Sequence, residues 1–342
     1  MKLGTRKSIT LHDLSKELGL SIQTISKALS GRAGMSEETR SRIIRTASVR
    51  GYLTVSQARE MVSRGIAPYP TFQFRFVLIQ SRQSMNYNVL LTEGLRERLD
   101  QLDHRLESYV LDEDVPDHAF SDWMEKRNLP TADGLFIAPR LLSDSTERKL
   151  FELPLPKVLI NYPRPLSRID SVIWDVFEAV CMAVDRLAQL GHTRIMYVGD
   201  IHSQRGYTRR WQAFEEMMGE LQLDHDAELH ITDVWDECML IDKLRSSQPT
   251  AIIAGIDEDI VRLHDSLTTL GYRIPEDISL VGLANGPVAA LPHLSRPQLL
   301  IRETGYKAAE KMLWRLANQG EPCEHIRIAG PFYNGQTIRR FS

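Results

Sequence analysis

Apolar side chains near the N-terminus recur at i, i+3 and i+4 spacing in three short segments, which is the pattern of one face of a helix. The three stripes are Leu11, Leu14 and Leu18; Ile25 and Leu29; and Ile43, Ile44 and Ala47. Thr10, Ser21 and Ser36 precede them as N-caps, Asp13 completes a capping box with Thr10, and Gly19 ends the first helix. Two short helices joined by a tight turn and followed by a third predict a helix-turn-helix domain.

A different pattern begins at Phe74, where short apolar runs alternate with segments of helical periodicity. The predicted strands are 76–79, 106–111, 134–137, 157–160, 194–198, 251–253 and 278–281. The predicted helices are 89–102, 179–191, 211–221, 260–271 and 304–320. Apolar strands separated by helices are typical of a parallel, doubly wound α/β sheet. Because the strands are too many for one sheet of usual size, we expect an α/β body of two lobes behind an all-α head.

Charge separates the head from the body. Residues 1–64 contain 12 Lys and Arg against 5 Asp and Glu, a net charge of +7, whereas the remainder contains 30 against 40, a net charge of −10. A basic head on an acidic body is expected when only the head meets the phosphates of nucleic acid.

Several classes of protein are disfavoured by what the sequence lacks. No apolar run reaches the ~20 residues that span a bilayer, and no basic and apolar leader indicates export, so we expect a cytoplasmic, nucleoid-associated protein. Cys181, Cys238 and Cys323 form no C-x-x-C pair and are expected to be reduced. The histidines have no metal-ligand spacing, so neither a metal nor another cofactor is expected. The body has no dinucleotide fingerprint, P-loop or nucleophile elbow, so we expect no enzyme activity.

The second helix carries the candidate DNA-reading side chains. Ile22, Gln23 and Lys27 point away from the stripe of Ile25 and Leu29. Glutamine can pair with the edge of adenine, lysine can reach guanine or phosphate, and isoleucine can contact a thymine methyl group. The alternative is an ordinary three-helix bundle with a solvated face.

The head resembles that of the LacI/GalR family of bacterial transcription regulators. The resemblance lies in the run ITLHDLSKELGLSIQTISKALSGRAGMSEETRSRIIRTASVRGY, above all its S-x-x-T-[IV]-S-[RK] core. It implies DNA contacts by Leu11, His12, Ser21, Ile22, Gln23, Thr24, Ser26, Lys27, Ser30 and Thr39. Lys27 stands where many members have arginine, which replaces a bidentate donor by a point charge.

The segment from Leu53 to Gly65 corresponds to the family's hinge helix. The resemblance implies that Met61 inserts into the minor groove and that Ala58 makes the close contact one turn earlier, so that the duplex bends. This chain has Thr54-Val55 where the family commonly has Pro-Asn. A plain flexible linker is the alternative.

The body resembles that of the same family, whose fold is the one of type I periplasmic sugar-binding proteins. The runs LGHTRIMYVGD, RRWQAF and PTAIIAGIDEDIVRLHDSLTTLGYRIPEDISLVGL carry this resemblance. We expect a head at 1–52, a hinge and linker at 53–71, and an effector-binding and dimerisation domain at 72–342. Its N-subdomain would be about 72–174 with 303–330, and its C-subdomain about 175–302 with 331–342. Three crossovers, near Asp175, Arg302 and Pro331, would join the subdomains around a ligand cleft.

The resemblance also implies an effector site, and here the sequence departs from the family. Arg210 occupies the ligand-clamping arginine position. The family commonly has an Asn-Asp pair, of which this chain keeps Asp257 but has Ile256 in place of the asparagine. Ala284, which is followed by Asn285, and Asn161 stand where the family commonly has carboxylates that bind sugar hydroxyls. Trp235, or its neighbour Val234, is the candidate aromatic platform, with Trp174 as a second choice.

Four arginines at predicted strand ends suggest the charge of the effector. They are Arg82, Arg140, Arg164 and Arg205. Losing carboxylates while keeping arginines raises the positive potential of the cleft, so we expect an anionic effector such as a sugar acid or sugar phosphate. In the alternatives these arginines are solvated or pair with acidic neighbours, or the pocket is degraded.

The sequence therefore predicts a homodimeric, sequence-specific regulator of transcription. Two heads would read a pseudo-palindromic operator, and a small effector would control the affinity, as in a repressor of a carbohydrate-related operon. A solute-binding protein would share the body, and a non-specific DNA binder would share the head.

Overall fold

The computed structural model describes residues 9–30, 34–50, 52, 73–81, 85–111, 116–138, 144–224 and 226–341 of the 342. Contacts within the chain divide it into two compact units, each described by itself. The first contains the residues up to Phe76 together with Arg96–Glu107, and the second contains Val77–Leu95 together with Ser108–Ser342.

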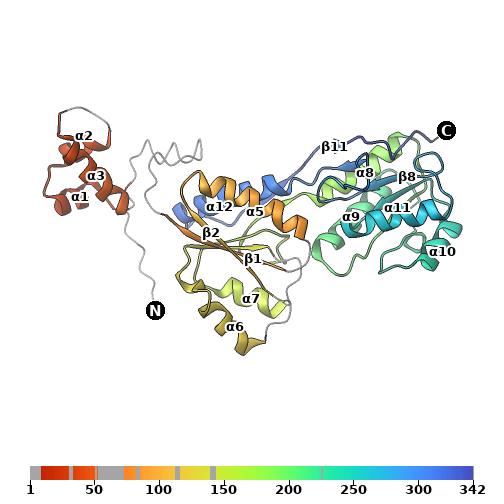
Figure 1. Ribbon diagram of the computed structural model, residues 1–342, viewed down its shortest axis with the longest axis horizontal. Coiled ribbons are helices and arrows are strands. Elements are labelled where there is room, and N and C mark those ends of the chain that lie inside the picture. The colour runs from red at the N-terminus through yellow and green to blue at the C-terminus, as the bar shows by residue number, and fades with distance from the viewer. Residues whose placement is uncertain are drawn as a thin grey trace. The chain divides into compact units, whose positions relative to one another are not determined.

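The head consists of α1 (Leu11–Leu18), α2 (Ile22–Leu29) and α3 (Glu37–Val49) (Figure 1). The predicted capping box is present, because Thr10 accepts from the Asp13 amide while the Asp13 carboxylate accepts from the Thr10 amide. Gly19 follows α1 with φ of 63°, a left-handed conformation that favours glycine. The head has its own small core, formed by Leu14, Ile25, Ala28, Leu29, Ile43 and Ala47.

A six-stranded sheet in the order β10-β5-β4-β3-β1-β2 forms the first lobe of the body, called here the N-lobe. Its strands are β1 (Arg75–Gln80), β2 (Arg105–Val110), β3 (Gly134–Ala138), β4 (Lys157–Leu159), β5 (Asp170–Trp174) and β10 (His325–Ile328). The pairs β3–β4, β4–β5 and β5–β10 are parallel. Helices α5 (Met85–Asp100) and α12 (Ile301–Ala317) cover one face, and α6 (Asp117–Glu125) and α7 (Asp144–Glu152) cover the other (Figure 1).

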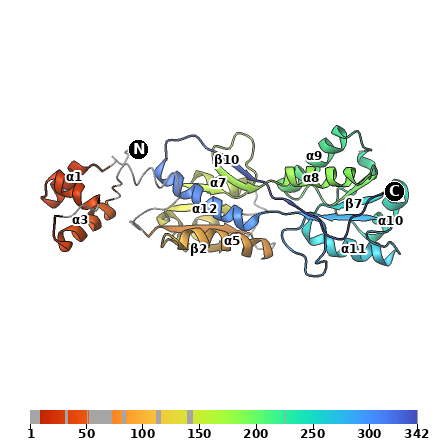
Figure 2. The same ribbon diagram turned by 90° about the horizontal axis from the view of Figure 1, so that it is seen from above.

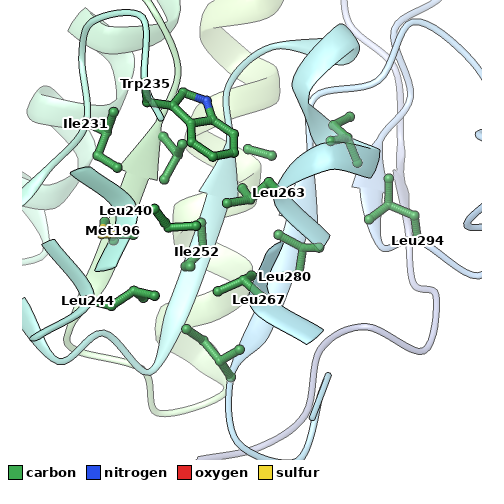
Figure 3. Packing of buried hydrophobic residues seen from close by; sticks show 14 of the residues in the cluster. Met196, Ile231, Trp235, Leu240, Leu244, Ile252, Leu263, Leu267, Leu280 and Leu294 are labelled. Carbon is green, nitrogen blue, oxygen red and sulfur yellow. The ribbon is translucent and has the colours of Figure 1, made fainter. Parts of the chain in front are cut away.

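A three-stranded parallel sheet in the order β6-β7-β8 forms the second lobe, the C-lobe. Its strands are β6 (Ile195–Val198), β7 (Ala251–Ala254) and β8 (Ser279–Gly282). Figure 2 shows α8 (Val176–Gln189) and α9 (Arg205–Glu220) on one face and α10 (Glu237–Ser247) and α11 (Ile260–Thr269) on the other. Buried aliphatic side chains fill the α10 and α11 side around Ile252 and Leu280 (Figure 3). The predicted α/β class, with N-terminal helices ahead of two parallel sheets, is confirmed.

The chain passes between the lobes where elements of one sheet are followed by elements of the other. Asp175 follows β5 and caps α8, since its carboxylate accepts from the amides of Phe177 and Glu178. The chain returns to the N-lobe after β9 (Arg296–Pro297) and leaves it again before β11 (Phe332–Tyr333). These two short strands pair antiparallel.

Candidate DNA-binding face and effector cleft

Helix α2 presents one apolar and one polar face, as the sequence predicts. The helix exposes Ile22, Gln23, Ser26 and Lys27, and its C-cap Ser30 is exposed as well. Ile25, Ala28 and Leu29 are buried. Ile22 is 43% exposed, so this large apolar side chain lies outside the core of the head. An isoleucine beside glutamine and lysine on an open helical face matches the mixture of contacts that base edges offer in the major groove.

The other candidate positions of the head lie around the starts of its helices. Ser21 accepts from the Thr24 amide at 3.1 Å and Ser36 accepts from the Thr39 amide at 3.2 Å, so these side chains cap α2 and α3. On α1, Leu11 is half-buried and His12 is exposed. Amides and hydroxyls at helix N-termini are suited to phosphate contacts. The hinge candidates Ala58 and Met61 lie outside the described residues.

Two cavities lie within the second unit. The inner cavity, of about 30 Å³, is lined from both lobes; the residues used below are Tyr87, Asn161, Tyr162, Trp174, Tyr207 and Arg210. The outer chamber, of about 470 Å³, is lined by C-lobe residues that include Asp200, Trp235, Glu258, Asp259 and Arg262. Gln204 and Tyr207 line both, so the two spaces adjoin. A chamber of a few hundred Å³ is of the size that binds small molecules.

Arg210 is one of the residues that line the inner cavity. Its side chain is 3% exposed, Nη1 donates to the carbonyl oxygen of Gly255, and Cζ lies 5.1 Å from the Tyr207 ring centroid. Its Nε is buried without a hydrogen-bond partner among the described residues. Trp174, 8% exposed, packs edge-on against Tyr87 at 5.3 Å, and its Nε1 is also buried with no partner in the part of the chain that the structure describes. Buried N–H groups in this condition are uncommon and mark a place where an acceptor would be stabilising.

Asp257 is held in place by Asn285, which lies 28 residues further along the chain. Asn285 donates to it from the backbone at 3.1 Å and from Nδ2 at 3.0 Å. Burial raises the pKa of Asp257, and these hydrogen bonds only partly offset the effect. Ala284 is fully buried in the C-lobe core. Of these predicted effector residues, none of Asp257, Ala284 and Asn285 is among the residues that line the two cavities.

The N-lobe wall of the inner cavity is built from β4, β5 and the turn after β4. Asn161 Oδ1 accepts from the Tyr162 amide at 2.7 Å. The Tyr162 hydroxyl donates to the Trp174 carbonyl oxygen at 3.3 Å and accepts from the Val176 amide at 3.0 Å. Burial raises the pKa of Tyr162 to about 12, so the hydroxyl keeps its proton at neutral pH.

The predicted aromatic platform is covered from within the protein. Trp235 is 3% exposed, its Nε1 donates to Asp259 at 3.3 Å, and the Arg262 guanidinium lies 4.0 Å from its ring centroid. That position is a cation–π contact, so a sugar ring could stack there only if Arg262 moved. Val234, the alternative platform, is 80% exposed on the rim of the outer chamber.

Two of the four arginines predicted to attract an anion are already paired. Glu147, on α7 of the N-lobe and only 3% exposed in its side chain, accepts from Arg164 Nε and from Arg205 Nη2, both at 2.6 Å. The alternative of acidic neighbours therefore holds for Arg164 and Arg205, while Arg82 and Arg140 lie outside the described residues. Sequence reasoning missed Glu147, because an acidic residue on an amphipathic helix carries no signal of a distant partner.

Comparison with known proteins places these features in one family. Residues 184–338 match the family model described as periplasmic binding protein-like domain. The HTH-type transcriptional regulator DegA of Bacillus subtilis (strain 168) is 24% identical over 310 residues, covering 86% of this chain and 88% of that protein. Catabolite control protein A of Priestia megaterium is 23% identical over 300 residues, covering 85% and 86%. The chain belongs to the LacI/GalR family. This regulator is thus a DNA-binding transcription factor and not an enzyme.

Solved structures share the fold of the regulator. The transcriptional regulator CelR–cellobiose complex has a TM-score of 0.67 and 16% identity, over 96% of this chain and 99% of that one. The lac repressor dimer bound to operator and the anti-inducer ONPF has a TM-score of 0.65 and 17% identity, over 97% and 100%. None of the helices that the structure describes in the regulator has the length and apolarity needed to cross a bilayer.

Proposed function

We propose that this regulator binds a pseudo-palindromic operator as a homodimer, with α2 of each head in the major groove. The observation that carries the proposal is the exposed face of α2, where Gln23 and Lys27 lie opposite the buried Ile25 in a head of net charge +7. Regulation of transcription implies action in the cytoplasm, at the nucleoid. The hinge contact by Met61, with Ala58 beside it, is part of the same proposal.

A small molecule in the cleft would control the affinity for the operator. The inner cavity supports this role, because its lining residues come from both lobes and a ligand there would fix the lobes relative to each other. A carbohydrate-related repressor is supported by relatives such as the CelR–cellobiose complex and a Weissella paramesenteroides regulator with bound sucrose. The anionic effector predicted from the arginines, a sugar acid or sugar phosphate, now rests mainly on Arg210, since Arg164 and Arg205 are paired.

Salt titration tests the DNA half of the proposal. Duplexes selected from a random pool by the full-length protein would be compared with scrambled duplexes of the same composition at several salt concentrations. We expect the selected duplexes to bind roughly 10³-fold or more tightly than the scrambled ones near physiological salt. Equal affinity for both sets would rule out sequence-specific regulation and leave non-specific DNA binding.

A further inference from the structure

Trp235 forms part of the wall of the outer chamber, and its ring is held from two directions. Its Nε1 donates to Asp259 at 3.3 Å, which fixes the polar edge of the indole. The ring also belongs to the buried cluster that includes Ile231 and Leu240 (Figure 3). A large aromatic ring held in this way is a preformed stacking surface wherever one of its faces borders a chamber.

Arg262, the third residue of α11, covers this ring. Its guanidinium carbon lies 4.0 Å from the ring centroid, and its Nη2 donates to the carbonyl oxygen of Trp235 at 3.0 Å. Arg262 is exposed to solvent and lines the same chamber, so its guanidinium lies where a ligand ring would stack. Trp235 itself is only 3% exposed.

Asp259 favours a cation over the ring. Burial raises the pKa of this carboxyl group, and the hydrogen bond from Trp235 and the positive charge of Arg262 act in the opposite direction. An aromatic face beside a carboxylate and a backbone carbonyl oxygen is complementary to a planar guanidinium, which can stack and donate at the same time. A neutral ring in that place would leave Asp259 without this positive charge.

The position of Arg262 sets a threshold for other ligands. An arginine on a flexible stem can turn into water, and a cation–π contact at an exposed site is weak. A group on a short tether nevertheless competes like a free molecule at a concentration on the order of millimolar. Neutral rings that bind the bare indole face only weakly are therefore displaced by Arg262, whereas ligands anchored by further contacts in the chamber are not.

We propose that Arg262 determines the ligand specificity of the outer chamber: it occupies the face of Trp235 as a tethered guanidinium and so excludes neutral, unmodified sugar rings from stacking there. The inference rests on the proposed function in one respect, that the cleft is the effector site.

Isothermal titration calorimetry on the full-length parent and on Arg262→Ala tests the proposal, with methyl β-glucoside and cellobiose as neutral probes. Removing the competing guanidinium should tighten the binding of at least one of these sugars about 10-fold or more. Arg245→Ala, which removes an exposed arginine of α10 that lines neither cavity, is the control and should leave sugar affinity unchanged. The proposal is overturned if neither sugar binds Arg262→Ala more tightly than the parent. Arg262→Gln, which removes the charge and keeps a polar side chain, decides the question if the alanine variant does not fold.

Ethylguanidinium tests whether the space left by the side chain is a guanidinium site. At millimolar concentration it should weaken the binding of cellobiose to Arg262→Ala, because it can take the place of the missing guanidinium over Trp235. Ethylammonium at the same concentration should compete less, since an ammonium group is a compact, strongly hydrated charge that does not stack. In the parent neither salt should discriminate in this way. Equal effects of the two salts on the variant would contradict the role assigned to the ring and Asp259.

Operator binding separates this inference from the proposed function. If cellobiose gains affinity for Arg262→Ala but does not change the affinity of that variant for the operator, Arg262 sets the specificity of the chamber and control by the cleft fails. If no sugar gains affinity while the protein still discriminates operator from scrambled DNA, the role of Arg262 is wrong and the regulator remains.

Discussion

At the scale of single residues, the head and the cleft differ in how their side chains are used. On α2 the side chains of Gln23 and Lys27 are exposed and stay available to meet bases. In the lining of the inner cavity, Arg210 Nε and Trp174 Nε1 stand out, because burial makes an unpaired donor costly. In the head, function is thus indicated by exposed polar side chains, and in the cleft by buried N–H groups without a hydrogen-bond acceptor.

Gln23→Ala tests base reading by the head. Removing a side chain that pairs with a base edge should cost about 1–3 kcal/mol on the preferred duplex and relax the preference at one position, with little change in the salt dependence. Binding measured on selected and singly substituted duplexes at several salt concentrations checks this. Lys16→Ala, an exposed charge on α1, is the control and should affect all sequences alike. A uniform loss for Gln23→Ala would assign it to the phosphate backbone instead.

Asp259→Asn tests the electrostatics of the outer chamber through pH. The pKa of Asp259 is raised above its ordinary value of 3.8, chiefly by burial, so the folded state is penalised once this carboxyl ionises. The variant should therefore be more stable than the parent at neutral pH, and the gain should vanish as the pH falls below the unfolded value. Urea unfolding of both proteins at neutral pH and near pH 3 measures the difference.

Asp277→Asn should change the free energy of unfolding in the opposite direction in the same experiment. Hydrogen bonds from Arg273 lower the pKa of Asp277, so its ionised form stabilises the fold and the variant should lose stability at neutral pH. The same sign of change in both variants would contradict the assignment for Asp259.

At the scale of elements, the apolar strands and longer helices could be predicted, while several polar ones could not. Strand β5 begins with Asp170 and Ser171, both buried, and sequence reasoning missed it because polar residues rarely start a core strand. They are tolerated because Arg315 donates to Asp170 at 2.5 and 3.0 Å and His325 bonds to Ser171 at 2.9 Å. These partners lie far away in sequence, so no local pattern reveals them. Helices α6, α7 and α10 and strand β10 likewise escape prediction.

Gly305→Ala tests how closely α5 and α12 cross. A Cβ at Gly305 would overlap the carbonyl oxygen of Leu91, and one at Gly94 would overlap that of Arg302, so the two backbones touch. The helices must separate to admit a methyl group, and we expect a loss of about 1–3 kcal/mol or more in the free energy of unfolding. Gly320→Ala, with open space around it, should have no comparable effect. Equal stability of both variants in denaturant titrations would show that the crossing relaxes freely.

At the scale of the whole molecule, the regulator combines a DNA-reading head with a two-lobed body, and the contacts between the lobes determine how a ligand could act on it. One such contact is ionic. Glu147 of the N-lobe holds Arg205 at the start of α9 in the C-lobe, and the residue before it, Gln204, lines both cavities. A change in the angle between the lobes must therefore alter this ion pair together with the cavities.

Glu147→Gln tests this contact. The buried carboxylate is shared by two guanidinium groups that are about one-third exposed, so its loss should destabilise the protein by roughly 2 kcal/mol, less than the ~3–5 kcal/mol of a fully buried pair. It should also change the affinity of any cleft ligand, because Arg205 adjoins Gln204. Glu152→Gln, exposed on the same helix, is the matched control. Both variants would be compared by thermal unfolding and by ligand titration. Equal stability and equal ligand affinity of the two variants would contradict the role of Glu147.

Local patterns in the chain were enough to specify the three head helices with their caps, the outward side chains of α2, the α/β class and the family. They follow from rules of capping, periodicity and strand composition, which act over a few residues. Which charges are neutralised and which remain became evident only in the folded chain. Arg164 and Arg205 share the carboxylate of Glu147, Arg262 covers Trp235, and residues of both lobes line one cavity. Such pairings join residues far apart in the sequence, and burial gives them their energy, so they exist only once the chain has folded.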